Sequence, residues 1–391
     1  MKPTISLHQD KEKTVLRGHP WIFPKAISGM TGSLVNGELV KVLDAKGHYL
    51  ATGVYNEHSL YRVRVLLQAW EQIADKSLPC MVQYRFQQAL TLRRALNLPN
   101  SGTNVFRMVN SEADGLSGLT IDCFGNTCVV SSTAYWVEAH KEMITQCIKQ
   151  MMAADEIIWM TQEKSLAQDG WKACNEGSPS VKVIDVCEGG VIYRVDFSLV
   201  QKTGLYLDQR ENHDRIALLA RGKRVLDLYT YTGGFALHAA KAGATRVTAV
   251  DSSKLAIEMA EVNAALNTLH NIDFIVSDSR NYLNKAGDYD LIILDPPKLV
   301  PSKRHLEQAK NYYRFLHREI FKSMRPGSLL LTCNCSSALS TLEFVNLVTS
   351  QAPPVGKQAR ILGVYGPASC HPMLPGFPEG NYLTALLLAI V

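Results

Sequence analysis

The sequence contains no C-x-x-C pair, although it has nine cysteines in 391 residues. Paired cysteines of that spacing are the usual mark of a structural zinc site, so we expect no metal of that kind. An odd number of scattered cysteines in a chain of this length is typical of reduced thiols. The cysteine pattern therefore predicts a cytoplasmic protein.

Long apolar runs are also missing. The first residues, Met1-Lys2-Pro3-Thr4, lack the apolar core of a signal peptide. The longest apolar stretch, residues 383–391, is interrupted by Thr384 and is too short to cross a bilayer, so we interpret it as a last strand. An apolar fraction of 46% and a net charge of +5 describe a globular chain of two or three domains. This charge permits a nucleic-acid partner without requiring one, and we expect no membrane partner.

The phosphate-binding pattern G-x-G-x-x-G is absent from a stretch that otherwise resembles a nucleotide-binding βαβ unit. An apolar strand at 224–228 is followed by a turn with Gly233 and Gly234, a helix at 235–241 and a second strand at 246–251. Glycines let the backbone come close to a ligand. Without the pyrophosphate pattern, we expect the ligand to be a nucleoside that carries no phosphates.

Two more predicted strands, 273–278 and 289–294, continue this arrangement. The second ends in the loop Asp295-Pro296-Pro297-Lys298. Carboxyl ends of parallel strands meet at one edge of a sheet, so we expect the acids after these strands to lie together. One acid after a strand is often a helix cap, but four in this order resemble the core of S-adenosylmethionine-dependent methyltransferases.

The residues before this core predict further domains. Residues 1–70 contain short glycine-punctuated strands and are expected to form a small β-barrel. In the strand at 61–66, Arg62 and Arg64 share one face, which could contact phosphates or could simply be solvated. A helix is predicted at 78–98, with Arg85, Arg93 and Arg94 pointing outward. We expect a middle α+β domain at 75–195 and the methyltransferase domain at 196–391.

Three segments carry a resemblance to a known family. Residues 19–66 resemble a PUA domain, residues 107–122 resemble the family's central signature, and residues 201–210 match its K-T-G-x-x-x-D-Q-R motif. The whole chain resembles the ribosomal RNA large subunit methyltransferase I-like family, and this resemblance implies a 5-methylcytosine enzyme of 23S rRNA, although members of the family differ in specificity. The resemblance implies a class I, Rossmann-like α/β domain with a mainly parallel sheet. Its cofactor would be S-adenosyl-L-methionine.

The resemblance also implies roles around that cofactor. The methionine end would lie near Tyr206, Gln209, Arg210, Asp227, Gly233, Gly234 and Phe235. The ribose would bind Asp251, and the adenine Asp278 with Ser279. Asp295 would lie beside both the cofactor and the base. Aromatic residues such as Tyr312 and Tyr313 could stack on a flipped base or could belong to the core.

Methylation of cytosine at carbon 5 requires an activated ring, because this carbon is a poor nucleophile. A thiolate that adds to carbon 6 supplies the activation. The family's S-C-S motif appears as Asn334-Cys335-Ser336 after a predicted strand at 328–332, so Cys335 is the expected nucleophile and Cys333 a buried neighbour. Asp295 would hold the cytosine amine, and Lys298 would either contact RNA phosphate or help to lower the pKa of the Cys335 thiol. The base that removes the carbon 5 proton is not identified.

Other functions remain open at this point. The same fold could methylate a different rRNA base, such as guanine, or the chain could be a non-catalytic RNA-binding protein. A small-molecule methyltransferase would not need two domains ahead of residue 195. The expected partner is 23S rRNA free of the assembled ribosome, and a homodimer is compatible with the sequence.

Overall fold

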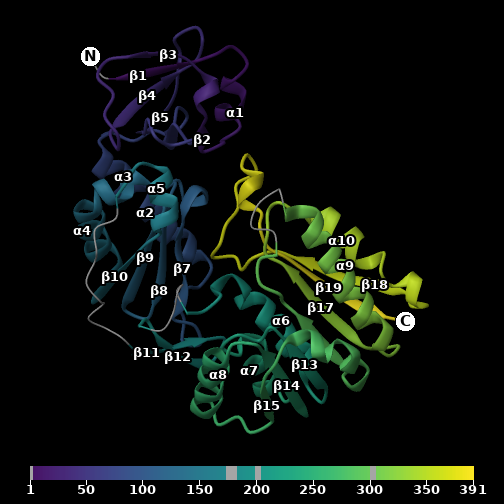
Figure 1. Cartoon of the computed structure of the whole chain (residues 1–391). Coiled ribbons are helices and arrows are strands. Elements are labelled where there is room, and N and C mark those ends of the chain that lie inside the picture. Colours follow the sequence, from purple (N-terminus) through teal and green to yellow (C-terminus); the bar gives the residue numbers. More distant parts are fainter. Residues whose placement is uncertain (1–2, 173–182, 199–203, 300–304) are drawn as a thin grey trace. The chain divides into compact units, whose positions relative to one another are not determined.

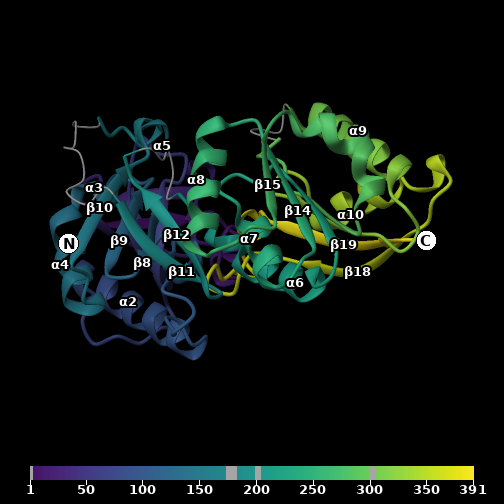
Figure 2. The ribbon, with the colours of Figure 1, turned by 90° about the horizontal axis from the view of Figure 1, so that it is seen from below.

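The computed structural model describes residues 3–172, 183–198, 204–299 and 305–391, and it forms two compact units (Figures 1 and 2). Unit 1 comprises Met1–Lys182, Phe197–Thr203 and Cys370–Gly380, and unit 2 comprises Val183–Asp196, Gly204–Ser369 and Asn381–Val391. None of the helices in the described ranges has the length and apolar character needed to cross a membrane.

Unit 1 begins with a six-stranded sheet in the order β2-β6-β5-β4-β1-β3. All neighbours are antiparallel except β1 and β4. Alternation in β4 buries Val40 and Val42 against the core and leaves Lys41 exposed. The elements are β1 (Thr4–Leu7), α1 (Glu12–Leu16), β2 (Trp21–Ile22), η1 (Pro24–Ala26), β3 (Ile27–Thr31), β4 (Leu39–Leu43), β5 (Tyr49–Tyr55) and β6 (Val63–Gln68).

A second sheet of unit 1 has the order β10-β9-β8-β7. Its elements are α2 (Leu78–Ala95), β7 (Val105–Asn110), η2 (Ser111–Asp114), β8 (Leu119–Phe124), β9 (Thr127–Ser132), α3 (Tyr135–Ala139), α4 (Lys141–Met152), β10 (Glu156–Thr161) and α5 (Glu163–Gln168). The predicted helix at 78–98 is therefore present as α2.

The expectation that the arginines of α2 point outward was wrong for Arg93. This residue is 1% exposed, and its two terminal nitrogens donate to the two carboxylate oxygens of Asp114 at 2.7 and 2.8 Å. A third bond goes to the carbonyl of Cys370 at 2.8 Å. Arg85 is half-buried and donates to the Leu66 carbonyl, while Arg94 is exposed as expected. A helical pattern cannot show that an arginine is buried when its partner comes from another element.

Unit 2 contains a seven-stranded sheet in the order β15-β14-β13-β16-β17-β19-β18. The five strands from β15 to β17 are parallel, and β19 is antiparallel to both of its neighbours. This confirms the Rossmann-like class and the last strand. The strands are β13 (Arg224–Leu228), β14 (Arg246–Asp251), β15 (Ile272–Val276), β16 (Leu291–Leu294), β17 (Leu329–Asn334), β18 (Ala359–Tyr365) and β19 (Thr384–Ile390).

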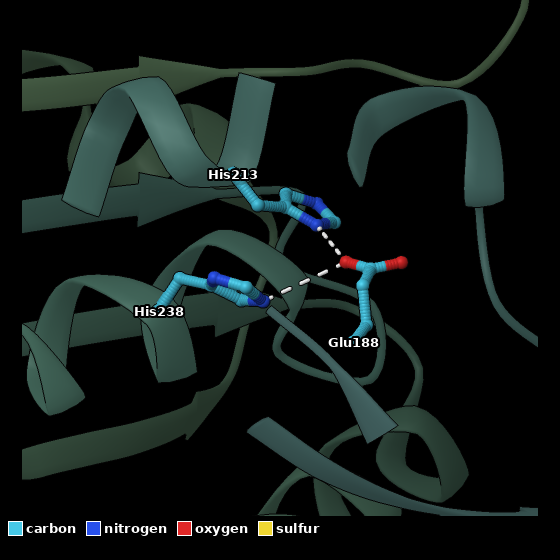
Figure 3. A group of neighbouring side chains, drawn as sticks. All are labelled: Glu188, His213 and His238. Carbon is cyan, nitrogen blue, oxygen red and sulfur yellow. Dashed lines mark hydrogen bonds and ion pairs between the residues drawn. The ribbon is translucent and has the colours of Figure 1, made fainter. Parts of the chain in front are cut away.

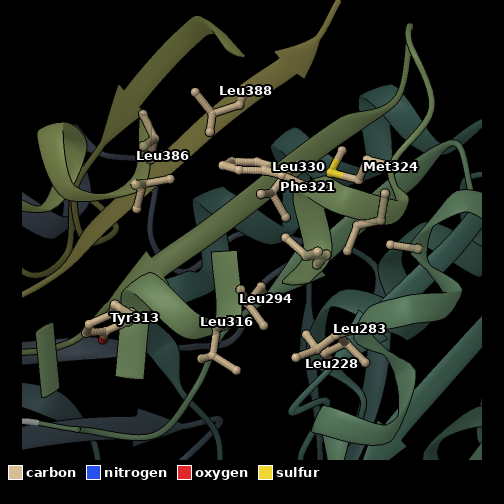
Figure 4. Packing of buried hydrophobic residues seen from close by; sticks show 14 of the residues in the cluster. Leu228, Leu283, Leu294, Tyr313, Leu316, Phe321, Met324, Leu330, Leu386 and Leu388 are labelled. Atoms are coloured by element: carbon tan, nitrogen blue, oxygen red, sulfur yellow. The ribbon is translucent and has the colours of Figure 1, made fainter. Parts of the chain in front are cut away.

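Helices cover both faces of this sheet, because its strands are apolar on both sides. On one face, α9 and α10 pack on a core that includes Leu228, Leu294 and Leu330 (Figure 4). On the other face, α6 and α7 pack on Val225 and Leu331. The helical elements are η3 (Leu207–Gln209), α6 (Arg210–Ala220), α7 (Gly234–Lys241), α8 (Lys254–Leu266), η4 (Ser279–Asp288), α9 (Leu306–Ser323), α10 (Thr341–Thr349), η6 (Pro353–Val355) and η7 (Pro378–Gly380).

One hairpin falls on a different side of the expected domain boundary. The strands β11 (Val183–Glu188) and β12 (Val191–Asp196) were assigned by sequence to the middle domain that ends at 195. The hairpin instead clusters with unit 2, where Asn263 of α8 accepts from the Arg194 amide at 2.8 Å and Asn267 accepts from the Ile192 amide at 2.9 Å. The two asparagine side chains continue the hairpin's hydrogen bonding, and no strand pattern reveals this.

Candidate active site

The carboxyl ends of four parallel strands meet at one edge of the unit 2 sheet. Leu228 of β13 pairs with Val250 of β14 and with Leu294 of β16, and Leu294 pairs with Thr332 of β17. The next residue of each strand therefore lies in the same row, and these residues are Tyr229, Asp251, Asp295 and Cys333. The register brings together side chains that are up to 104 positions apart in sequence (333 − 229 = 104).

The turn between β13 and α7 is held in an unusual backbone conformation. Tyr229 and Tyr231 have positive φ angles of 66° and 52°, which are uncommon for residues with a side chain. Asp251 stabilises this turn, because its Oδ2 accepts from the Tyr231 amide at 3.0 Å. Ser279 helps as well, since its hydroxyl accepts from the Tyr229 amide at 3.2 Å. Asp251 and Ser279, both expected at the cofactor, thus hold the conformation of this turn.

The two glycines of the turn serve different purposes. Gly233 has a φ of +90° at the start of α7, a conformation that favours glycine. A Cβ on Gly234 would lie only 2.7 Å from Nε2 of His213. The close approach at Gly234 is therefore to an imidazole of the protein itself. Phe235, the next residue, is buried and contacts the same ring edge-on, with 4.5 Å between centroids.

Asp227 of β13 is a buried acid with one oxygen available for a ligand. Its Oδ2 accepts from the Thr230 hydroxyl at 2.5 Å and from the Ala236 amide at 3.0 Å. Its Oδ1 is buried and has no hydrogen-bond partner among the described residues. Burial raises the pKa of Asp227 to about 6. A buried acceptor without a partner costs free energy, so this oxygen fits a cationic ligand group such as the ammonium of a methionine moiety.

Asp295 lies beside Gln209 from the D-Q-R motif. The Gln209 amide nitrogen Nε2 donates to Asp295 Oδ2 at 3.0 Å, and its Oε1 accepts from Asn212 at 2.6 Å, which fixes the orientation of the amide. Burial raises the pKa of Asp295 to about 7, and the charges of Asp208 and Asp227 contribute to the same shift. At neutral pH, Asp295 is therefore divided between its acid and its carboxylate forms.

Cys335 follows β17, in a loop that its neighbour Asn334 organises. The Asn334 amide nitrogen donates to the carbonyls of Ser336 and Leu339 at 3.1 and 3.2 Å, and its Oδ1 accepts from the buried Tyr313 hydroxyl at 3.2 Å. The Cys335 Sγ lies 3.9 Å from the Pro296 carbonyl oxygen of the D-P-P-K loop. The two loops expected to carry the chemistry are thus in contact.

Cys333 has a different environment. It is fully buried, and burial together with the charge of Asp295 raises the pKa of its thiol well above the usual value. A thiol in this state is a poor nucleophile. The structure therefore agrees with the expectation that Cys333 is a buried neighbour.

Tyr206 lies close to the same loops. Its ring contacts Tyr231 edge-on, with 5.3 Å between centroids. Burial raises the pKa of Tyr206 to about 12, and Tyr231, Asp295 and Cys335 add to this shift through their charges. Arg210, at the start of α6, donates to Glu211 at 3.3 Å. The described part of the K-T-G-x-x-x-D-Q-R motif therefore borders the sheet edge where the carboxyl ends of the parallel strands meet. Residues 201–203 of the motif lie outside the described ranges.

Other expected residues lie in places that sequence did not reveal. Asp278 pairs with Arg280, the residue two positions further on, and caps η4 by accepting from its amide. Tyr313 is buried in the core of unit 2, whereas Tyr312 is partly exposed, and its hydroxyl lies 3.3 Å from that of Tyr229. Lys298 is exposed.

The expectation of an exposed Arg62 and Arg64 face was wrong. Every residue of β6 is buried, and Arg64 is 6% exposed. Its guanidinium donates to Asp169 at 3.3 Å and to Ser117 at 3.1 Å. Arg62 precedes the strand, is half-buried and donates to the Glu57 carbonyl. Because both faces of β6 are covered within unit 1, Arg64 is an internal ion-pair partner and cannot contact RNA phosphates.

Several residues of the site were not found by sequence reasoning. Asn334 was read only as part of a motif, yet it holds the Cys335 loop. His213 packs beneath the glycine turn and was not singled out. Single polar residues such as Asn334 at the end of β17 and His213 on α6 carry no distinctive pattern, so only the tertiary structure identifies them.

Comparison with known proteins supports the cofactor class. Residues 147–362 match the model of the S-adenosylmethionine-dependent methyltransferase family, and residues 5–68 match a PUA-like domain. A crystal structure of SMU.776, a methyltransferase complexed with SAH, has a TM-score of 0.82 at 20% identity and covers all of both chains. This similarity supports the fold.

Two curated relatives match the full length of the chain. A protein named Ribosomal RNA large subunit methyltransferase I from Aeromonas salmonicida (strain A449) is 34% identical over 397 residues, with 99% of each chain covered. A protein of the same name from Alteromonas mediterranea is 32% identical over 400 residues, covering 100% of this chain and 99% of the relative.

The fold, the strand edge and the family match define a class I S-adenosylmethionine-dependent methyltransferase. More closely, the chain belongs to the ribosomal RNA large subunit methyltransferase I-like family, with an N-terminal PUA-like domain. Its cofactor is S-adenosyl-L-methionine, and the unpartnered Oδ1 of Asp227 beside the Gly233 turn fits the charged end of that molecule.

Proposed function

We propose that this protein methylates carbon 5 of a cytosine in 23S rRNA, with Cys335 as the nucleophile and Asp295 as the residue that holds the base. The observation that carries this proposal is the contact between the Cys335 loop and the D-P-P-K loop, at 3.9 Å from Sγ to the Pro296 carbonyl. The names of the full-length relatives support an rRNA substrate.

Asp295 suits a base that must be both oriented and activated. In its acid form, a carboxyl group accepts from the exocyclic amine with one oxygen and donates to ring nitrogen 3 with the other. Gln209 already donates to Oδ2, which leaves Oδ1 to carry the proton. Protonation of the ring nitrogen draws electrons from carbon 6, so the Cys335 thiolate can add there.

Bond formation and proton transfer balance through these residues. The Sγ–carbon 6 bond forms as ring nitrogen 3 takes the proton of Asp295, and carbon 5 then becomes nucleophilic. When bound, S-adenosyl-L-methionine would supply the methyl group, and its sulfonium would become a neutral thioether. Loss of the carbon 5 proton, release of Sγ and return of the nitrogen 3 proton to Asp295 restore the aromatic ring. The residue that takes this last proton is not among those assigned.

The remaining assignments place the cofactor along the strand edge. Asp227, with Gly233, Gly234 and Phe235, would border the methionine moiety together with Tyr206, Gln209 and Arg210. Asp251 would bind the ribose hydroxyls, while Asp278 and Ser279 would border the adenine. Lys298, which is exposed on the D-P-P-K loop, would contact RNA phosphate.

Mass spectrometry of 23S rRNA tests the overall proposal. A strain that lacks the gene is expected to lose one 5-methylcytosine, and purified protein with S-adenosylmethionine should restore it on rRNA stripped of ribosomal proteins. Loss of a methylguanosine would identify a different target base. Restoration only on assembled subunits would contradict free rRNA as the substrate.

Replacing Asp251 with alanine is expected to weaken S-adenosylmethionine binding by about tenfold or more, because the ribose loses a charged acceptor. Isothermal titration calorimetry measures this change. Asp273→Ala is a matched control, since Asp273 lies on the neighbouring strand β15 and pairs with Arg246. Unchanged affinity in folded Asp251→Ala would remove the ribose assignment.

A further inference from the structure

Three buried side chains with metal-binding atoms converge in unit 2, on the protein side of the glycine turn (Figure 3). Glu188 ends β11, His213 lies on α6, and His238 lies on α7. Their exposed fractions are 2%, 6% and 3%. Burial of an acid and two imidazoles at one point is costly unless they bind one another or a shared ion.

The distances within this group are uneven. The His213 Nδ1 lies 2.7 Å from Glu188 Oε1, which is a normal hydrogen-bond length. The His238 Nε2 lies 3.6 Å from the same oxygen, and it is buried without a hydrogen-bond partner among the described residues. The His213 ring is therefore hydrogen-bonded to the carboxylate. The Nε2 of His238 faces the same carboxylate but has no hydrogen-bond partner among the described residues.

The donor atoms of the group also suit a cation. Glu188 offers a carboxylate oxygen and each histidine offers a ring nitrogen, and these atoms all lie within 4.8 Å of one another. A carboxylate and a neutral imidazole are the forms in which these side chains bind metals.

The surrounding backbone leaves room for the two rings. A Cβ on Gly189, whose φ is +54°, would lie 2.7 Å from His238 Cε1, and a Cβ on Gly234 would lie 2.7 Å from His213 Nε2. Asp214 lies 3.8 Å from His238 Nδ1 and is half-exposed. At this distance Asp214 makes no hydrogen bond to the ring and acts only as a nearby negative charge.

We propose that Glu188 Oε1, His213 Nδ1 and His238 Nε2 bind one zinc ion. Two imidazoles and a carboxylate form a ligand set typical of zinc with a fourth position for water, and such a set needs no cysteine. On binding, Nδ1 of a neutral His213 ring gives up its hydrogen bond to Glu188 and the ring carries its proton on Nε2, so the zinc ion is held by two neutral imidazoles and one carboxylate. Asp214 offsets part of the remaining positive charge.

The geometry requires only small side-chain movements. Zinc–ligand bonds of about 2.0–2.2 Å place tetrahedral ligand atoms about 3.3 Å apart. The His213 Nδ1 and Glu188 Oε1 atoms, now 2.7 Å apart, must therefore move slightly apart. The other pairs of ligand atoms, which lie within 4.8 Å, must move slightly closer. The ion would join β11, α6 and α7, and α7 begins at the glycine turn, so zinc would stabilise the wall of the cofactor site.

The experiment uses the full-length chain after treatment with EDTA. Three quantities are measured for the wild type, His238→Ala and Glu188→Gln. They are the zinc content by mass spectrometry, the zinc affinity by competition with a chromophoric chelator, and the Tm with and without zinc. The wild type is expected to bind one equivalent of zinc with a rise in Tm of several degrees. Both variants are expected to bind zinc at least about 100-fold more weakly than the wild type. Glu188→Gln keeps the shape of the side chain if His238→Ala folds poorly.

Two controls separate this site from adventitious binding. His48→Ala removes an exposed histidine that bonds Asp44 at 2.9 Å, and it should leave zinc affinity unchanged. Cobalt bound at the proposed site should lack the strong charge-transfer absorption of cobalt–thiolate bonds, which binding to cysteines would produce. An absence of zinc stabilisation in the wild type, equal stabilisation in His238→Ala, or a thiolate spectrum would overturn the proposal and leave the group as a buried ion pair.

Discussion

Replacing Cys335 with alanine is expected to lower rRNA methylation by several orders of magnitude while S-adenosylmethionine still binds. Without the thiolate, carbon 5 of cytosine stays unactivated, because no other group assigned to the strand edge can add to carbon 6. Single-turnover methylation of 23S rRNA measures the chemical step, and calorimetry measures cofactor binding. RNA that carries 5-fluorocytosine at the target cannot lose a proton from carbon 5, so it should form a stable adduct with the wild type only.

Cys333→Ala is the matched control for this result. The side chain is fully buried and its thiol pKa is raised, so its loss should cost about 1–2 kcal/mol of stability and leave the chemistry in place. An adduct formed through Cys333 would keep the covalent mechanism but make Cys333 the nucleophile. Normal methylation by Cys335→Ala without any adduct would contradict the covalent mechanism proposed here, and a guanine or amine target that needs no covalent step would then be the better assignment.

Asp295→Asn is expected to slow methylation by about 10²–10⁴-fold, the usual contribution of a general acid. The amide can still bind the cytosine amine, but it cannot protonate the ring. Because the pKa of Asp295 is about 7, its acid form is lost as the pH rises through neutrality. The wild-type rate should therefore carry an alkaline limb near pH 7 that is missing in the variant.

Stability gives an independent check on Asp295. In the unfolded chain the carboxyl ionises near its usual value of 3.8, whereas in the native state it ionises near 7. The native state therefore binds the extra proton between these values, and its stability falls as the pH rises from about 4 to about 7. Asp295→Asn should gain Tm relative to the wild type at pH 8 and much less at pH 4. An equal difference at both pH values would mean that the pKa of Asp295 is not raised.

The sequence alone was sufficient for the Rossmann-like domain. Apolar runs at 224–228 and 246–251, each with an acid near its carboxyl end, indicate buried parallel strands when a glycine turn and a short helix separate them. Parallel pairing then fixes which residues share an edge, so the neighbourhood of Asp251, Asp295 and the Cys335 loop followed from strand order. In this architecture, the sequence pattern identifies the strands, and their parallel order then determines which residues lie together at the sheet edge.

Only the tertiary structure decided the partners of the charged side chains. Arg64 and Arg93 looked like surface residues, yet each is buried against an acid from a distant element. Glu188, His213 and His238 come from three elements and form one group without any motif. Hydrophobic periodicity reports which face of an element is apolar, but it carries no information about a polar residue whose partner lies 21 to 105 positions away. The free-energy cost of burying such a residue depends on whether the fold brings an acid or an imidazole next to it. Sequence patterns do not report this partner, and for that reason they missed these ion pairs.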